Sequence, residues 1–137
     1  MPAERRHARI LAMQALCQWE VQRDTSSESL QEFLAGQQPA PDVLAYATGV
    51  IESFWKQQEL VDQQISAATE KWEFSRISTV ERNVMRVAVV ELFDRNIPPK
   101  VALNEAIEIG REYGGGESPR FINGVLDRIL RALPGGE

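Results

Sequence analysis

The sequence holds few side chains that carry out covalent or metal chemistry. Among its 137 residues there is one cysteine, Cys17, and one histidine, His7. A lone cysteine cannot form a disulfide within the chain, and one residue of each kind cannot supply a zinc site. On one helix these two residues would be separated by about 15 Å of rise, which is too far for proton transfer. The sequence therefore predicts no enzyme, no metal site and no cofactor.

Long apolar runs are also absent. The first apolar segment is interrupted by Gln14, Gln18 and Glu20, unlike the core of a signal peptide, and no segment approaches the ~20 apolar residues of a membrane helix. The composition, 43% hydrophobic and 26% charged, is ordinary for a soluble protein. We expect one domain over residues 1–137, cytoplasmic and without membrane contact, large enough to bury a core unaided.

Acidic residues outnumber basic ones overall, 20 to 15, but basic residues are concentrated at the start of the sequence. The formal net charge is −5, yet residues 1–9 contain Arg5, Arg6 and Arg9 against a single acidic residue, Glu4. The helix dipole favours acidic residues at a helix N-terminus, so this placement is unfavourable for the helix alone. A local positive site on an acidic body is typical of a protein that binds a polyanion. A solvated helix start is the alternative interpretation.

Apolar residues recur at three- and four-residue spacing along most of the sequence, and no strand alternation is present. This pattern predicts a first helix over about residues 4–22, with its apolar stripe facing inward and its arginines facing outward. Further helices are expected over about 29–36, 41–68 with a bend near 57–60, 78–92, 99–113 and 118–133. Together they predict an all-α bundle of six or seven helices.

Capping signals mark several of these helix ends. Sequence spacing predicts capping boxes or N-caps at Ser29 with Glu32, at Ser78 with Glu81, and at Ser118 before Pro119. The segment EFSRIS, residues 73–78, is expected to interrupt the helical pattern. Glu105 and Glu108 lie three residues apart, which predicts a solvated helix face.

Two glycine features lie toward the C-terminal end of the sequence, a triplet at 114–116 and Gly124. The triplet at 114–116 leads into a helix start, an arrangement that can hold a phosphate, but it lacks the lysine and spacing of a P-loop, so a helix stop is its expected role. Gly124 lies inside the last expected helix, where glycine costs roughly 1 kcal/mol relative to alanine. Close packing of a neighbouring helix, or the approach of another backbone, would offset this cost, and packing is the favoured explanation.

Arg120 and Phe121 stand just before this glycine. An arginine beside an aromatic ring at a helix start is typical of proteins that hold single-stranded nucleic acid, since the ring stacks on a base while the guanidinium pairs with a phosphate. A core phenylalanine beside a solvated arginine is the alternative interpretation.

Four segments, taken in order, carry a family resemblance. They are RRHARILAMQALCQWE at 5–20, VERNVMRVAVVEL at 80–92, PPKVALNEAIEIGREYG at 98–114 and FINGVLDRI at 121–129. They resemble the NusB family of bacterial transcription antitermination factors. The resemblance implies a NusB-like fold of about seven helices in two helical subdomains, without catalysis. It also implies binding of the boxA element of nascent RNA together with NusE, a ribosomal protein of the small subunit, so that RNA polymerase reads through terminators, notably in ribosomal RNA operons.

The resemblance also implies roles for individual residues. Those that match RNA-contacting positions are Arg5, Arg6 and Arg9 in the first helix, Arg120 and Phe121 near the last helix, and Glu117 and Ser118 at the rim of that second patch. Cys17 and Glu81 match positions facing NusE. His7, Cys17 and Pro119 depart from the usual family residues, which bears on partner affinity.

The two arginine-containing ends of the sequence are expected to join into one RNA-binding strip. Replacing Arg6 and Arg9 by alanine is then expected to weaken RNA binding without changing the melting of the protein. The alternatives are a helical protein adaptor or a homodimer without sequence-specific RNA binding. A helical domain of an RNA methyltransferase is disfavoured, because no residues remain for a catalytic domain.

Overall fold

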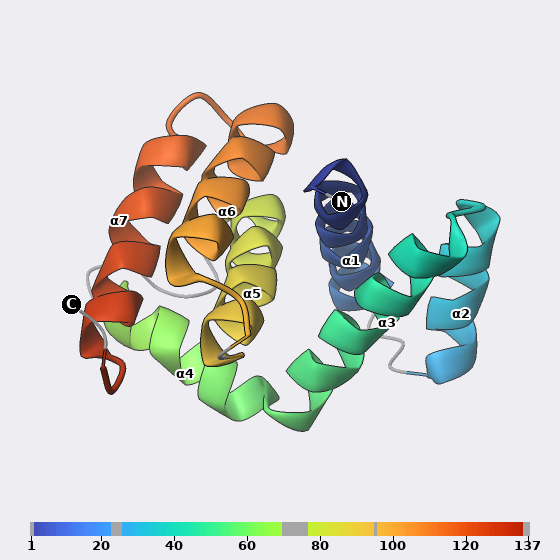
Figure 1. The fold of residues 1–137 in the computed structure, drawn as a ribbon, viewed down its shortest axis with the longest axis horizontal. Helices are drawn as coiled ribbons and strands as arrows, with labels where there is room; N and C mark the ends of the chain where they lie inside the picture. Colours follow the sequence, from blue (N-terminus) through green and yellow to red (C-terminus); the bar gives the residue numbers. More distant parts are fainter. Residues whose placement is uncertain (1, 23–25, 70–76, 95, 136–137) are drawn as a thin grey trace.

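The computed structural model describes residues 2–22, 26–69, 77–94 and 96–135, which form seven helices and no strand (Figure 1). The helices are α1 (Pro2–Gln22), α2 (Ser27–Gly36), α3 (Pro41–Lys56), α4 (Gln58–Ala68), α5 (Thr79–Phe93), α6 (Pro99–Tyr113) and α7 (Ser118–Ala132). The predicted all-α bundle is therefore confirmed. Among the described residues, no helix combines the length and the apolar character needed to cross a membrane.

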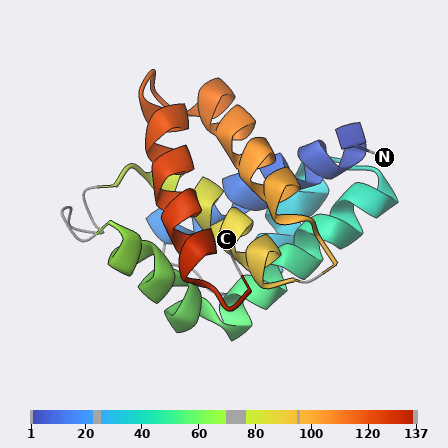
Figure 2. The ribbon, with the colours of Figure 1, turned by 60° about the vertical axis from the view of Figure 1, so that its left-hand side comes forward.

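The helices form two groups that share α5. Helices α1, α2 and α3 pack together, and α4, α6 and α7 pack around the other side of α5 (Figures 1 and 2). Ten consecutive residues of α5, from Arg82 to Glu91, are buried. A helix that is covered on all faces in this way fixes both groups against each other, and this is the arrangement of two helical subdomains that the sequence predicted.

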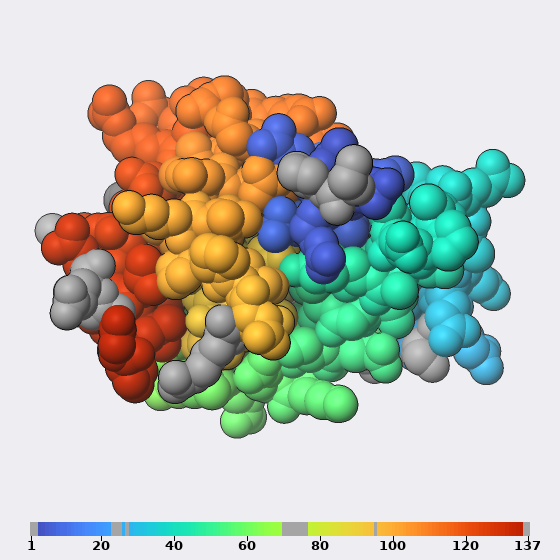
Figure 3. Space-filling view, viewed as in Figure 1, coloured from blue at the N-terminus to red at the C-terminus, as the bar shows by residue number. Residues whose placement is uncertain are grey.

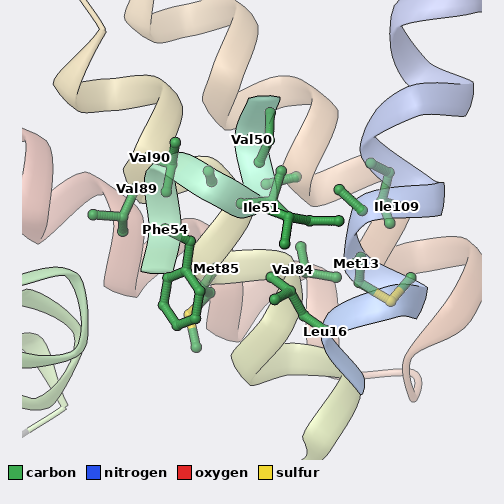
Figure 4. Close-up of a cluster of buried hydrophobic side chains, with 14 of the residues drawn as sticks. Met13, Leu16, Val50, Ile51, Phe54, Val84, Met85, Val89, Val90 and Ile109 are labelled. Atoms are coloured by element: carbon green, nitrogen blue, oxygen red, sulfur yellow. The ribbon is translucent and has the colours of Figure 1, made fainter. Parts of the chain in front are cut away.

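The core is formed where α1, α3 and α5 meet (Figure 4). Phe54 and Ile51 of α3 are fully buried beside Met13 and Leu16 of α1 and Met85 of α5. Removing a buried phenylalanine side chain costs about 3–5 kcal/mol in typical proteins, so this cluster is the main apolar support of α1.

A buried ionic network reinforces the same junction. Glu20 of α1 accepts hydrogen bonds from Arg82 and Arg86 of α5, and Arg86 also binds Asp62 of α4 through its Nε and Nη2 atoms at 2.8 and 2.9 Å. The guanidinium of Arg86 also faces the ring of Phe54 at 5.0 Å. The network ties three helices together, and α1 is thereby held in a fixed orientation.

The helix ends agree with the sequence at some positions and differ at others. The capping box of Ser78 and Glu81 is confirmed, whereas α2 begins two residues before Ser29 because Ser26 caps it by accepting a hydrogen bond from the Ser29 amide. The expected bend near 57–60 is a break at Gln57, which separates α3 from α4. Most of the expected interruption over 73–78 lies outside the described residues.

Candidate nucleic-acid interface

The first turns of α1 place its three arginines in three different surroundings. The guanidinium carbon of Arg5 lies 3.9 Å from the centre of the Tyr46 ring on α3, an arrangement typical of a cation–π contact. Arg6 binds Glu105 of α6 with two hydrogen bonds, Nε to Oε1 at 2.9 Å and Nη2 to Oε2 at 2.6 Å. Arg5 and Arg6 are exposed, as the sequence predicted.

Arg9 does not face outward, so this part of the sequence interpretation is wrong. The residue is only 4% exposed, and its Nε contacts both carboxylate oxygens of Glu91, at 2.9 and 2.8 Å. Glu91 is 1% exposed and also accepts a hydrogen bond from the Tyr46 hydroxyl. Arg9 therefore joins α1 to α5 as a buried ion pair and holds the helix that carries Arg5 and Arg6. Its contact with RNA stays a prediction.

The start of α1 lies against α6 on the face seen in Figure 3, and a groove of about 560 Å³ lies between these two helices. It is lined by Ala3, Arg6, His7, Ile10, Gln14, Glu105 and Tyr113. Arg6 and Glu105 bridge it at one point, with side chains that are 45% and 16% exposed. The expectation that Glu105 lies on a solvated face is wrong, because this carboxylate is turned toward α1.

Electrostatics in this groove favour a charged Glu105. The hydrogen bond from Arg6 lowers the pKa of the Glu105 carboxyl, an effect opposed by partial burial and strengthened by the charges of Arg6 and Arg9. Arg9 also contacts Glu105, with Nη1 and Oε1 separated by 3.4 Å. At neutral pH the groove therefore contains an anion, the Glu105 carboxylate, already bound to Nε and Nη2 of Arg6.

A second hollow, of about 310 Å³, lies between the end of α4 and the exposed side of α7. It is lined by Ala68, Thr69, Arg120, Phe121, Gly124, Val125 and Arg128. Arg120 is exposed, and Phe121 is half-buried with its ring against the core. The ring therefore packs against the core and also lines the hollow. Its stacking on an RNA base stays a prediction. Gly124 is exposed, and a Cβ built on it would meet no other described residue within 4 Å, so the close packing that the sequence favoured there is absent.

The turn between α6 and α7 separates the two hollows. Ser118 is only 2% exposed; its hydroxyl accepts a hydrogen bond from the Gly115 amide and donates one to Glu81. Ser118 is therefore the first residue of α7 and not its N-cap as the sequence predicted, since Glu117 takes that position. Contact of Glu117 and Ser118 with RNA stays a prediction. Gly114 is required here, because a Cβ at this position would lie 2.7 Å from the Ser118 Cβ.

Cys17 and Glu81 lie near the same end of α5. The Cys17 thiol is half-buried, 3.7 Å from the Thr79 carbonyl oxygen and 3.6 Å from the Asn83 side-chain nitrogen that donates to it. Burial raises the pKa of this thiol, a shift that the hydrogen bond from Asn83 opposes. The structure thus brings together the two residues that the sequence resemblance assigned to a protein partner.

The expected strip of cationic residues is divided by α6, which lies between the start of α1 and α7 in both ribbon views (Figures 1 and 2). The two hollows have no lining residue in common. Tyr113, at the end of α6, lines the first hollow, and residues 115–117 of the following turn are exposed. A single RNA strand contacting both hollows stays a prediction.

Several residues of these sites carry no signal in the sequence. Glu91, Tyr46 and Glu105 approach the arginines from other helices and lie 41 or more positions further along the chain. Arg128 follows Phe121 by seven positions, or two turns of α7, and lines the same hollow, but the end of α4 that closes this hollow carries no signal in the sequence. Among the described residues, no group of acidic, histidine and cysteine side chains is suited to hold a metal ion.

Comparison with known proteins decides the family. A model of the NusB family matches residues 6–131. The chain belongs to the NusB family. The resemblance recognised in the four sequence segments is therefore confirmed over nearly the whole chain.

Relatives in the NusB family match over their full length. The transcription antitermination protein NusB of Anaeromyxobacter dehalogenans is 38% identical over 135 residues, which cover 98% of this chain and 95% of the relative. The structure of T. maritima NusB is 38% identical, covers 93% of this chain and 91% of that chain, and has a TM-score of 0.84. A structure of the antitermination factors NusB and NusE in complex with dsRNA is 25% identical, covers 97% and 100%, and has a TM-score of 0.87.

Proposed function

We propose that this chain is a transcription antitermination factor that binds boxA-type single-stranded RNA in nascent transcripts, ribosomal RNA transcripts among them, together with the ribosomal protein NusE. Membership of the NusB family supports the proposal, as does the similarity to NusB in the complex with NusE and dsRNA. The observation that carries it is the pair of exposed arginines, Arg5 and Arg6, on an otherwise acidic chain, where Arg6 lines an open groove.

RNA phosphates would bind at the start of α1. Arg5 and Arg6 supply accessible guanidinium groups there, while Arg9 holds the helix through Glu91. Each phosphate contact on a single strand contributes about 0.7 to the slope of log affinity against log salt concentration. The adjoining nucleotides of the same strand would contact Arg120 and Phe121, beside the exposed Glu117.

NusE would dock at the end of α5 that carries Cys17 and Glu81. Glu81 already binds Ser118, so a partner held there would also contact the beginning of α7. In this proposal residues 1–137 act as one RNA-binding domain in the cytoplasm, as part of the antitermination complex of RNA polymerase. No catalytic step is assigned to any residue.

The test is competitive RNA binding with and without purified NusE. A boxA-like RNA is expected to bind in a salt-dependent way and to outcompete a scrambled RNA of equal length, and NusE is expected to increase this preference. The variant Arg6→Ala should weaken binding and reduce the salt slope by about 0.7. Arg131→Ala is the matched control, because Arg131 is an exposed arginine paired with Asp127 at the opposite end of α7 from Arg120.

Equal binding of the boxA-like and scrambled RNAs, with or without NusE, would contradict the proposal. That outcome would favour a generic electrostatic surface, in line with a helical adaptor that uses the same arginines to bind acidic proteins.

A further inference from the structure

Arg5 differs from the other two arginines at the start of α1 in what holds its side chain. Arg6 and Arg9 are each bound by a carboxylate from another helix. Among the residues that the structure describes, no carboxylate binds Arg5, and its guanidinium carbon lies 3.9 Å from the centre of the Tyr46 ring instead. Arg5 therefore keeps a positive charge that no bound carboxylate neutralises, on a side chain that is nevertheless held.

The contact with a ring leaves the N–H groups of Arg5 available to a ligand. The donors of a guanidinium lie in its own plane, so an aromatic ring against its face does not use them in the way a carboxylate does. At Arg6, by contrast, Glu105 takes up both Nε and Nη2. A cation–π contact thus fixes a guanidinium without competing with a phosphate for the same donors.

The ring of Tyr46 is itself fixed to the core of the molecule. Tyr46 lies near the start of α3 and is half-buried, and its hydroxyl donates to the carboxylate of Glu91, which is 1% exposed. Burial and this hydrogen bond raise the pKa of Tyr46 to about 12, an effect that Arg9 and Arg5 oppose, so the hydroxyl stays protonated and donates at neutral pH. Because Arg9 binds the same carboxylate, the ring is tied to α1 and α5 together.

We propose that Tyr46 is a positioning residue for RNA binding. Its ring holds the guanidinium of Arg5 at the surface, so that the N–H groups meet a phosphate with a smaller loss of conformational freedom. The inference rests on the proposed function, in which Arg5 contacts RNA phosphates. It adds α3 to the binding site, although no residue of α3 lines either of the two hollows.

The test is a double-mutant cycle between Tyr46 and Arg5. Tyr46→Leu should weaken binding of a boxA-like RNA about two- to fivefold, the range that corresponds to a cation–π contact at an exposed site. In the Arg5→Ala background the same substitution should leave the affinity unchanged. Phe33→Leu is the matched control, because Phe33 is a half-buried aromatic residue of α2 beside the C-terminal half of α1, and its replacement should not alter RNA binding in either background.

The variant Tyr46→Phe separates the ring from the hydroxyl. It keeps the aromatic face toward Arg5 and removes the hydrogen bond to Glu91. Its melting temperature should therefore fall, while its affinity for the RNA should stay closer to that of the unsubstituted protein than the affinity of Tyr46→Leu does. A residue that served only the stability of the fold would not show this rescue by phenylalanine.

A second measurement uses the unsubstituted protein and does not depend on the folding of any variant. A nuclear Overhauser contact between the side-chain protons of Arg5 and the ring protons of Tyr46 is expected in the free protein. It should persist in the complex with the boxA-like RNA, because the phosphate binds the edge of the guanidinium while the ring stays on its face.

Three results would overturn the positioning role and leave the proposed function intact. The first is that Tyr46→Leu weakens binding equally with and without Arg5, which would mean that the tyrosine acts on the fold alone. The second is that Tyr46→Leu binds the RNA as tightly as the unsubstituted protein or more tightly. The third is that the Overhauser contact disappears in the complex, since the ring and the RNA would then compete for Arg5. Failure of the unsubstituted protein to prefer the boxA-like RNA over the scrambled one would instead overturn the proposed function, and the role of Tyr46 with it.

Discussion

The substitution Glu105→Gln is expected to make the protein bind RNA more tightly while making it less stable. In the free protein both oxygens of Glu105 are bound to Arg6, at 2.9 and 2.6 Å, so an RNA phosphate must displace the carboxylate to reach the same donors. Glutamine keeps the shape of the side chain but removes its charge, and its amide nitrogen cannot accept from a guanidinium. Arg6 is therefore released for the RNA.

The size of the effect follows from the exposure of the pair. The Arg6 side chain is 45% exposed, and ion pairs of this kind are typically worth about 0.2–1 kcal/mol because water screens them. In Glu105→Gln the RNA no longer has to break the Arg6–Glu105 ion pair, and this corresponds to at most a roughly fivefold gain in affinity. The same interaction is lost from the folded state, so the melting temperature should fall by roughly 1–4 °C.

The assay is a fluorescence-anisotropy titration of a labelled boxA-like RNA at several salt concentrations, beside thermal melting of the free protein. Glu32→Gln is the control, because Glu32 is exposed on α2, in the helix group opposite α6, and its replacement changes the net charge equally. A gain in affinity shared by both variants would mean that only net charge matters. Weaker binding by Glu105→Gln would refute the competition outright, since Glu105 would then be positioning Arg6 for the RNA.

The remaining predictions concern the buried charges. Arg9→Ala should lower the free energy of unfolding by about 3–5 kcal/mol in urea titrations, because Glu91 would remain buried without its partner. The sequence had instead predicted that a variant with both Arg6 and Arg9 replaced by alanine would melt like the unsubstituted protein. Partial burial raises the pKa of the Glu20 carboxyl, but the hydrogen bonds and charges of Arg82 and Arg86 lower it by more. The net effect is that Glu20 has a pKa below the usual value of 4.5. Its contribution to stability should therefore be complete above about pH 4.5 and be lost as the pH falls through the folded-state value, and Glu20→Gln should flatten this part of a stability–pH curve. Burial and the bond to Glu91 raise the pKa of Tyr46 to about 12, so in Tyr113→Phe, where Tyr46 is the only tyrosine, phenolate absorbance should rise near pH 12. Because the unfolded tyrosine ionises near pH 10, its stabilisation should be lost between about pH 10 and 12. A phenolate transition near pH 10 in the folded protein would show that this hydroxyl is not held by Glu91.

The helices were predictable because their signals are local. The apolar stripe of α1, the capping box at Ser78 and Glu81, and the proline at the start of α3 each depend on residues within a few positions of one another. The errors also have local causes. Ser29 and its glutamate fit a capping box, but Ser26 caps α2 first, and the sequence alone does not decide between two serines three positions apart.

The site was less predictable because its charges are paired across the fold. From the spacing in α1, Arg9 and Arg5 share an outward face, yet α5 places Glu91 opposite Arg9 and α6 places Glu105 opposite Arg6. Whether an arginine is accessible depends on whether a carboxylate binds it in the folded chain, and these carboxylates lie 82 or more positions away in the sequence. A cluster of arginines in a sequence therefore indicates an anion site, whereas the number of accessible guanidinium groups is decided by packing.

The same reasoning shows that the contacts of Arg5 and Arg9 are linked through one carboxylate. Arg9 is neutralised by Glu91 and cannot bind RNA without exposing that carboxylate, so its charge is used to fix the direction of α1. Arg5 is held over the ring of Tyr46, whose hydroxyl is bound to the same Glu91. One buried carboxylate thus orients an accessible arginine as well as a buried one. A guanidinium that is already held in place loses less conformational entropy on meeting a phosphate, so this arrangement would favour the RNA binding proposed for Arg5.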